Sequence, residues 1–507
     1  MSTSNDSQPV FGQPVPGIAP EPRLRAINRQ QLLMRTIDVE QLIAEDHPAR
    51  ALWEFTGRLD LTRFYECIKS VAGCAGQPSL DPRLMIALWL YAYSRGIGSA
   101  REVSRMCAYE PGLQWLCGLE PINHHSLSDF RVEHEEALTE MFTQVLGVLS
   151  AEGLITLERV MHDGTRIGAA ASGNTFRSEE TLREHLRLAK EQVAAMGDPR
   201  LEPANNQRQA KAQQRAKRER QQRLETAVQQ LEKLKAERTT NKRSPRASTS
   251  DPEARVMKRP GGGFEPSYNV QVSTDAAAGL IVGVGVTQSG ADAPHLVPAM
   301  ERLEVTFGKL PKQVVADAGY ISNQNVKALA ERTDLIGPLQ TANPARVEGA
   351  RKRRGITAEF TNEKFVYQPD ADCFHCPEGK TLCFYKTEDN TGGLMRTYRA
   401  QAADCSSCPS KTACCPKSPA RQIRHLEEDL EITEFRQKMN TAEKRKIYQQ
   451  RSQVAEFPYA WIKEKLKLRQ FHVRGLKKVT LEALWAALTY DIQQWIRLRW
   501  RTRLQVA

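Results

Sequence analysis

Short runs of apolar and β-branched residues predict several strands. LITLERVMHD at 154–163 and QVVAD at 313–317 each end in an aspartate. SYNVQVSTD at 267–275 and GLIVGVGVT at 279–287 are joined by a short turn and predict a hairpin, and DLIGP at 334–338 predicts a further short strand. The central part of the chain is therefore expected to form a sheet.

Helical patterns surround these strands. Residues 292–307 and 323–333 predict helices between them, and residues 440–500 predict helices beyond them. The order strand, hairpin, helix, strand, helix and strand is typical of a mixed sheet with helices on its faces, so the fold class is multidomain α/β. The apolar face of the C-terminal helices consists of Leu481, Leu484, Trp485, Leu488, Ile492, Trp495 and Ile496.

Residues 22–150 carry apolar positions at three- and four-residue spacing and predict a helical domain. Short helices separated by tight turns favour a helix-turn-helix arrangement that binds DNA. Arg101, Arg105 and Arg131 would then be available for phosphates or base edges. A generic helical bundle is the alternative.

A basic insertion interrupts the strand pattern at residues 177–260. Residues 207–246 hold thirteen Lys and Arg against four Asp and Glu, and no aromatic residue, so they cannot form a core alone. One helical stripe contains Leu224, Val228, Leu231 and Leu234. This stripe predicts a long helix that packs one face on the protein or pairs with a second copy, with a solvated surface or DNA phosphates on its other side.

Length and charge narrow the class of protein. A chain of 507 residues suggests two to four domains, and 72 Lys and Arg against 60 Asp and Glu give a net charge of +12, which favours a polyanionic partner such as nucleic acid. Residues 1–21 are polar and rich in proline, which predicts a disordered tail rather than a signal peptide. No apolar stretch reaches the length of a membrane span, so we expect a cytoplasmic, nucleoid-associated protein.

Two CxxC motifs predict a structural zinc site in residues 342–440. CFHC at 373–376 and CSSC at 405–408 offer the thiols of Cys373, Cys376, Cys405 and Cys408. Four thiolates at such spacing can form a tetrahedral Zn²⁺ site. The other candidate ligands are His375, Cys383, Cys414 and Cys415. Reduced thiols in a loop-rich insertion are the alternative.

The strand-end aspartates Asp163 and Asp317 have an ordinary explanation and a chemical one. Each could close an Asx-turn or cap a helix. Neighbouring parallel strands could instead bring the two carboxylates together to hold two Mg²⁺, with Mn²⁺ as an alternative, for phosphoryl displacement. Such a site needs a third acid. Glu456 is the candidate because it is seven residues from Lys463, which places both on one helical face, although Pro458 predicts a helix start or a kink there.

Motifs in this order resemble those of a bacterial insertion-sequence DDE transposase. They are HDGT at 162–165, GGFEPSYNVQVSTD at 262–275, ADAGY at 316–320 and the YxxR…E…K region at 448–463. The resemblance extends from about residue 25 to about residue 498. It is closest to the group with a helical N-terminal transposase domain and an RNase H-like catalytic core.

The resemblance implies a role for each matching residue. The catalytic, metal-binding acids would be Asp163, Asp317 and Glu456, and the contacts to transposon-end DNA would come from Tyr448, Arg451 and Lys463, with Arg166 also neutralising phosphate charge. The chain departs from the family at EFPYA, where Glu-Pro-x-Phe-Gly is common, and the gap from arginine to glutamate is one residue longer. Glu464 is the next candidate for the third acid.

The expected function is Mg²⁺-dependent hydrolysis at the ends of an insertion sequence, followed by attack of the freed 3′-OH on target DNA. The partners would be double-stranded DNA and a second copy in a homodimer that bridges the two ends. The rivals are a metal-dependent nuclease without strand transfer and a non-catalytic DNA-binding regulator.

The expected domains are a tail (1–21), a helical DNA-binding domain (22–150), the first part of an RNase H-like core (151–341) with the basic insert (177–260), a zinc-ribbon-like cysteine-rich insertion (342–440) and C-terminal helices completing the core (441–507).

Overall fold

The computed structural model describes most of the chain. The described residues are Gln30, Leu32, Met34, 36–70, 78–195, 207–237, 244–259, 261–339, 344–390 and 393–506. The tail predicted at residues 1–21 lies outside them. Among the described helices, none combines the length and the apolar character that a membrane crossing requires.

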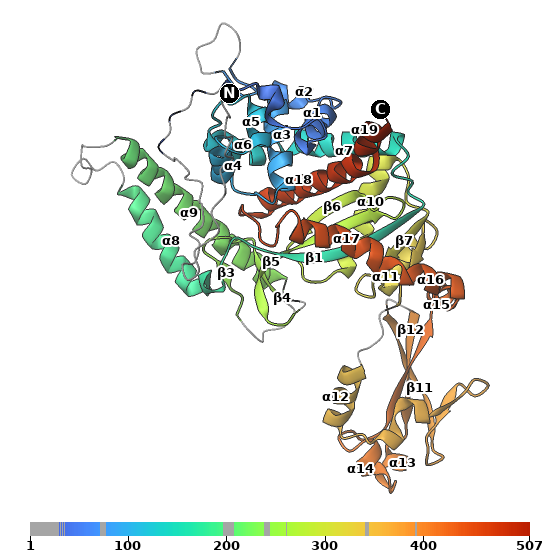
Figure 1. Cartoon of the computed structure of the whole chain (residues 1–507). Coiled ribbons are helices and arrows are strands. Elements are labelled where there is room, and N and C mark those ends of the chain that lie inside the picture. The colour runs from blue at the N-terminus through green and yellow to red at the C-terminus, as the bar shows by residue number, and fades with distance from the viewer. Residues whose placement is uncertain are drawn as a thin grey trace, which may run out of the picture.

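A six-stranded mixed sheet forms the centre of the molecule (Figure 1). Its strands are β1 (Arg159–Gly168), β4 (Arg255–Lys258), β5 (Phe264–Asp275), β6 (Ile281–Thr287), β7 (Gln313–Ala316) and β8 (Asp334–Ile336). β1 pairs antiparallel with β5, which pairs antiparallel with β6 and β4, and on its other edge β1 pairs parallel with β7, which pairs parallel with β8. The predicted strands and hairpin are all present.

Both predicted boundaries of the first strand were wrong, because β1 begins at Arg159 and does not end at Asp163. It continues to Gly168, since β5 supplies antiparallel partners as far as Ser267. The parallel pairing with β7 does end here, with His162 opposite Ala316. Asp163 is therefore the first residue beyond the parallel ladder, within a longer antiparallel strand.

The predicted helices cover the sheet. Those of the core are α10 (Leu296–Phe307), α11 (Asn323–Leu329), α16 (Ala442–Gln449), α17 (Arg451–Glu464) and α18 (Leu476–Trp495), and a further helix, α15 (Leu430–Met439), lies in the range that was assigned to the cysteine-rich insertion. Met161, Val315 and Ile336 lie side by side on the sheet and form a small apolar cluster with Ile447 of α16 and Ala455 of α17. Because side chains alternate along a strand, this cluster defines the sheet face that α16 and α17 cover.

The N-terminal helices and the sheet share one hydrophobic core. These helices are α1 (Pro48–Thr56), α2 (Thr62–Glu66), α3 (Pro82–Ser94), α4 (Ala100–Met106), α5 (Pro111–Cys117), α6 (His124–Glu133) and α7 (Glu135–Ala151). Helix α18 lies between them and the sheet, in contact with α3, α6, α7 and β6 (Figure 1). The predicted apolar face of α18 is buried, and Trp485 and Trp495 are almost fully enclosed.

The expectation that Arg131 is available for DNA was wrong. Its side chain is 6% exposed and its Nη1 lies 3.7 Å from an oxygen of Glu482, which is fully buried in α18. The Arg131 guanidinium also stacks over the Trp89 ring, 4.6 Å from its centre. Arg131 therefore joins the N-terminal helices to α18, whereas Arg101 and Arg105 are exposed.

The basic insertion forms a helical hairpin of α8 (Glu179–Ala194) and α9 (Gln207–Ala236), which projects from the sheet in Figure 1. Leu224, Val228 and Leu231 of α9 are buried in a cluster with Leu182 of α8. The apolar stripe of α9 could pack on the protein itself or on a second copy. In the structure it packs on α8 of the same chain.

The cysteine-rich insertion is a separate five-stranded antiparallel sheet, in the order β13-β12-β11-β10-β9. Its elements are α12 (Pro344–Arg354), β9 (Val366–Gln368), β10 (Cys373–His375), β11 (Thr381–Asn390), β12 (Gly393–Ala400), α13 (Ala402–Ser406), α14 (Lys411–Cys414) and β13 (Gln422–Glu428). It has its own small core around Phe374, Leu382 and Tyr398. This five-stranded meander is more extensive than the zinc-ribbon-like fold that was expected.

Candidate active site

Asp163 and Asp317 lie side by side on the sheet. β1 and β7 are paired in register up to His162 and Ala316. The residue that follows each of these is one of the two aspartates. Neighbouring strands are about 4.8 Å apart. Each aspartate comes two positions after a residue of the apolar cluster beneath α16 and α17, so both side chains point to that face. The structure thus brings together two acids that are far apart in the sequence.

The Asp163 carboxylate is largely enclosed and held at both oxygens. Oδ1 accepts a hydrogen bond of 2.8 Å from the Gly164 N–H. Oδ2 is 2.9 Å from Nη1 of Arg451, in an ion pair whose side chains are 16% exposed for the arginine and 18% for the aspartate. Burial raises the pKa of Asp163, while Gly164 and Arg451 act to lower it and the charge of Asp317 to raise it further. Arg451 therefore supplies the counter-charge of this carboxylate.

A third carboxylate, that of Asp292, borders the same site, and the sequence analysis missed it. Asp317 Oδ1 accepts a hydrogen bond of 2.8 Å from the Gly319 N–H. A Cβ atom placed on Gly319 would lie 2.9 Å from Asp317 Oδ1 and 3.6 Å from Asp292 Oδ2. Asp292 follows β6 in VTQSGAD, so the signal that could have found it is another acid shortly after an apolar strand.

Buried polar side chains hold Asp292 from below. Asn269 Nδ2 and Gln271 Nε2 both donate to its Oδ1, at 2.8 and 3.3 Å. Gln271 Oε1 accepts from the Tyr320 hydroxyl at 2.6 Å and lies 3.1 Å from His162 Nε2. Burial lowers the pKa of His162 to about 3, so its ring is neutral near pH 7. His162 and the two amides that hold Asp292 are therefore hydrogen-bonded and uncharged.

Helix α17 lies along β1 and contacts it at successive turns. Arg451 pairs with Asp163, the Tyr459 hydroxyl donates to the backbone carbonyl of Asp163, and Lys463 Nζ donates to Thr165 Oγ1 at 2.5 Å. Burial lowers the pKa of Lys463, because a charged ammonium is costly away from water. These contacts place two cationic side chains beside the strand that carries Asp163.

Glu456 lies on the same helix as Lys463, as predicted. Pro458 is inside α17, so Glu456 is in the helix and not at its start. Seven residues rotate a helix by a near-whole number of turns, so Glu456 and Lys463 lie within about 20° of each other around the axis. Within the described chain the exposed Glu456 side chain has no hydrogen bond or ion pair, whereas Glu464 is paired with Arg469. This geometry favours Glu456 over Glu464 as the acid that faces a substrate.

The other two predicted DNA contacts differ in their surroundings. Tyr448 is in the last turn of α16, and the Arg451 guanidinium lies 5.8 Å from the centre of its ring. Arg166 donates to the backbone carbonyls of Lys258 at 3.0 Å and Gly290 at 3.2 Å. Arg166 therefore braces the loop that leads to Asp292, and its contact with DNA stays a prediction.

Among the described residues, the structure contains no group of three or more His, Cys, Asp or Glu side chains in an arrangement that could hold a metal ion. The adjacent carboxylates of Asp163 and Asp317 are nevertheless hard oxygen donors of the kind that Mg²⁺ prefers. Mg²⁺ usually binds through one or two carboxylates together with substrate phosphates and water. The donor chemistry of the pair therefore fits Mg²⁺ bound together with a DNA phosphate.

The predicted zinc ligands are only partly brought together. Cys376, Cys405 and Cys408 line one pocket of the cysteine-rich insertion, and Cys415 lines it too. Cys373 does not line this pocket, because it lies on β10 opposite Cys383 of β11.

Comparison with known protein families gives two matches. Residues 375–496 match the model of a Transposase DDE domain. The resemblance to insertion-sequence DDE transposases is confirmed. Residues 37–133 match a second model, Transposase domain (DUF772), which covers most of the N-terminal helices. No curated protein matches the chain significantly.

The DDE domain match covers only one side of the candidate site. It includes α17 with Arg451, Glu456 and Lys463, but it begins after Asp163 and Asp317. The assignment of the two aspartates therefore depends on their geometry.

Proposed function

We propose that the protein is a DNA transposase that cuts at the ends of an insertion sequence and joins the freed 3′-OH to target DNA. The observation that carries the proposal is the adjacency of Asp163 and Asp317 under α17. This helix also presents Glu456 and the cations Arg451 and Lys463. Acids for metal binding and cations for phosphate then occupy one surface.

The strand order supports an RNase H-like core. Three antiparallel strands, β6, β5 and β1, are followed at the edge of β1 by the parallel strands β7 and β8. This arrangement ends one parallel ladder at Asp163 and Asp317, which is the position that the resemblance assigns to the first two acids of the DDE set.

Each side chain has a role in the proposed reaction. Asp163, Asp317 and Glu456 would hold Mg²⁺, which supplies electrostatic stabilisation to a phosphodiester under attack and lowers the pKa of bound water. Arg451 keeps Asp163 ionised and, with Lys463, offsets the charge of the DNA backbone. The remaining catalytic contribution is positioning, because α17 is fixed on β1 by buried contacts.

Double-stranded DNA is the proposed partner. Two ends must be held at once, so a homodimer in the bacterial nucleoid is the proposed assembly. The exposed Arg101 and Arg105 of the N-terminal helices are available for the DNA backbone.

The test uses purified full-length protein, labelled duplexes of the DNA flanking its coding region, a supercoiled target plasmid and Mg²⁺. We expect Asp163→Asn, Asp317→Asn and Glu456→Gln to lower the cleavage rate by roughly 1000-fold while DNA binding persists, because metal contacts contribute several kcal/mol to the transition state. Glu464→Gln is the matched control and should cleave normally.

Product analysis separates the proposal from its rivals. Wild-type protein should give end DNA joined to the plasmid, and cleavage without joined products would indicate a nuclease. Wild-type protein that binds the ends but does not cleave them in the presence of any divalent metal would indicate a DNA-binding regulator. Full activity of all three variants would refute the assignment of the acids.

A further inference from the structure

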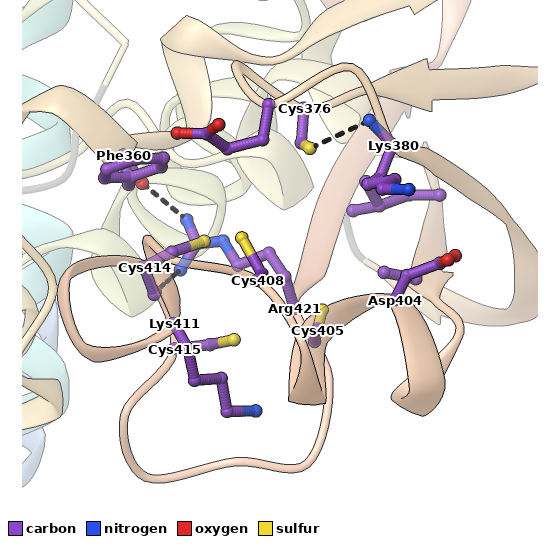
Figure 2. Close-up of a pocket in the computed structure, with 13 residues that line it drawn as sticks. Phe360, Cys376, Lys380, Asp404, Cys405, Cys408, Lys411, Cys414, Cys415 and Arg421 are labelled. Atoms are coloured by element: carbon purple, nitrogen blue, oxygen red, sulfur yellow. Dashed lines mark hydrogen bonds between the residues drawn. The ribbon is translucent and has the colours of Figure 1, made fainter.

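Five cysteine thiols surround one small cavity in the cysteine-rich insertion (Figure 2). They come from Cys376, Cys405, Cys408, Cys414 and Cys415. The cavity has a volume of about 20 Å³, which suits a single small occupant. It lies far from α17 and the carboxylates, at the other end of the insertion in Figure 1.

The turn after β10 presents the Cys376 sulfur to this cavity. The Lys380 N–H donates to Cys376 Sγ at 3.2 Å, and the Cys376 N–H donates to the Lys380 carbonyl at 2.9 Å. Gly379 permits this tight turn because it adopts a φ of 73°, a conformation that favours glycine. A backbone N–H directed at sulfur stabilises a thiolate.

The segment from α13 to α14 supplies the other sulfurs. Cys405 is in α13, Cys408 is in the turn after it, and Cys415 directly follows α14. The Lys411 N–H donates to the Cys408 carbonyl at 3.1 Å, which closes this turn. The Cys415 thiol interacts with the Cys405 thiol. Sulfurs from two separate parts of the insertion therefore face one another across the cavity.

Cys373 is the weakest of the earlier candidates for this cavity. Its neighbour Phe374 belongs to the core that contains Cys414 and Cys415, and side chains of adjacent strand residues point to opposite faces. Cys373 therefore points away from the cavity, toward its cross-strand partner Cys383.

Cationic side chains also line the cavity. They are Lys380, Lys411 and Arg421. A zinc ion with four thiolates has a net charge of about −2, which nearby cations offset. The acids Glu378 and Asp404 line the cavity too, and Lys411 and Arg421 also donate hydrogen bonds to backbone carbonyls of the insertion.

We propose that Cys376, Cys405, Cys408 and Cys415 bind one structural Zn²⁺. Among the described residues these side chains do not form a group that could hold a metal ion, so binding requires the four sulfurs to move closer together. Zn²⁺ replaces the protons of the thiols, which leave to solvent, and the four Zn–S bonds join the α13–α14 segment to the β10–β11 turn. The insertion gains stability in this way because its own apolar core is small.

The experiment measures the zinc content of the full-length protein after purification without added metal and after exposure to a weak chelator. We expect about one zinc per chain in the wild type. Cys376→Ser and Cys415→Ser should lose it, whereas the matched controls Cys373→Ser and Cys383→Ser should retain it.

A second measurement identifies the ligands without relying on variants that could fail to fold. Co²⁺ exchanged into wild-type protein should give the intense absorption of tetrahedral cobalt with four thiolates. A wild type with no zinc and no such cobalt spectrum would overturn the proposal, and so would zinc that is lost in Cys373→Ser but kept in Cys415→Ser. Both readouts are independent of DNA cleavage, so they distinguish failure of the zinc site from failure of the proposed transposase activity.

Discussion

Replacing Arg451 by glutamine should move the acid side of the pH–rate profile toward higher pH. The Arg451 guanidinium is 2.9 Å from Asp163 Oδ2, and both side chains are largely enclosed. A hydrogen bond to a charged group contributes about 1.5–3 kcal/mol, and one pKa unit corresponds to about 1.4 kcal/mol. Loss of Arg451 removes a stabilisation of this order from the ionised carboxylate and should therefore raise the pKa of Asp163, already raised by burial, still further.

The direction of the effect follows from the form of Asp163 that binds metal. Only the ionised carboxylate binds Mg²⁺ well. If the pKa of Asp163 is higher in Arg451→Gln, this variant should lose activity at a higher pH than the wild type does when the pH is lowered. The assay is the initial rate of end cleavage between pH 5.5 and 9 at a fixed, subsaturating Mg²⁺ concentration. Arg451→Lys, which keeps the charge, should shift the profile less than Arg451→Gln.

Arg445→Gln is the matched control, because Arg445 is an exposed arginine on the neighbouring helix α16. It removes the same charge and should leave the shape of the profile unchanged. If Arg451→Gln lowered the rate equally at every pH, the arginine would act on DNA alone and the argument about Asp163 would be refuted.

Two further substitutions test the geometry. Gly319→Ala should abolish most cleavage, because the new Cβ would lie 2.9 Å from Asp317 Oδ1. Gly290→Ala is the control and should cleave normally, because a Cβ there would meet open space. Equal cleavage rates for the two variants would contradict this. Arg131→Ala should lower the free energy of unfolding by about 3 kcal/mol, because it removes the cation 3.7 Å from the buried Glu482 carboxylate, which then keeps only His472 and neighbouring hydrogen-bond donors as partners. Arg131→Lys, which keeps a cation, should lose less stability than Arg131→Ala in a denaturant titration, and equal losses for the two variants would contradict a role of the charge.

The sequence predicted the local elements of the core well. Five of the six strands of the central sheet, the helix that carries Glu456 and Lys463, and the apolar face of α18 were predicted, whereas β4 lies in the range assigned to the basic insertion and was not. Such patterns depend on residues that are close in sequence, and the periods of helices and strands make them visible. The extent of β1 was wrong because its last residues depend on pairing with β5, which no local pattern records.

The long-range contacts came only from the tertiary structure. The burial of Arg131 against Glu482 and the position of Asp292 beside Gly319 both join distant segments. The choice between Cys373 and Cys415 as a zinc ligand also depends on the fold, because Cys415 lines the cavity and Cys373 lies on the face of β10 that points away from it. Spacing along the chain does not settle such choices, because it does not fix how separate elements pack.

By itself, the sequence determined where apolar strand segments lie and which residues share a helical face, since both are properties of a few consecutive residues. The fold decided that Asp163 stands next to Asp317 and that Arg451 neutralises it. The physical reason is strand register, because a shift of one residue between β1 and β7 would turn one carboxylate to the opposite face of the sheet. Register is fixed by the packing of the whole core and therefore belongs to the tertiary structure alone.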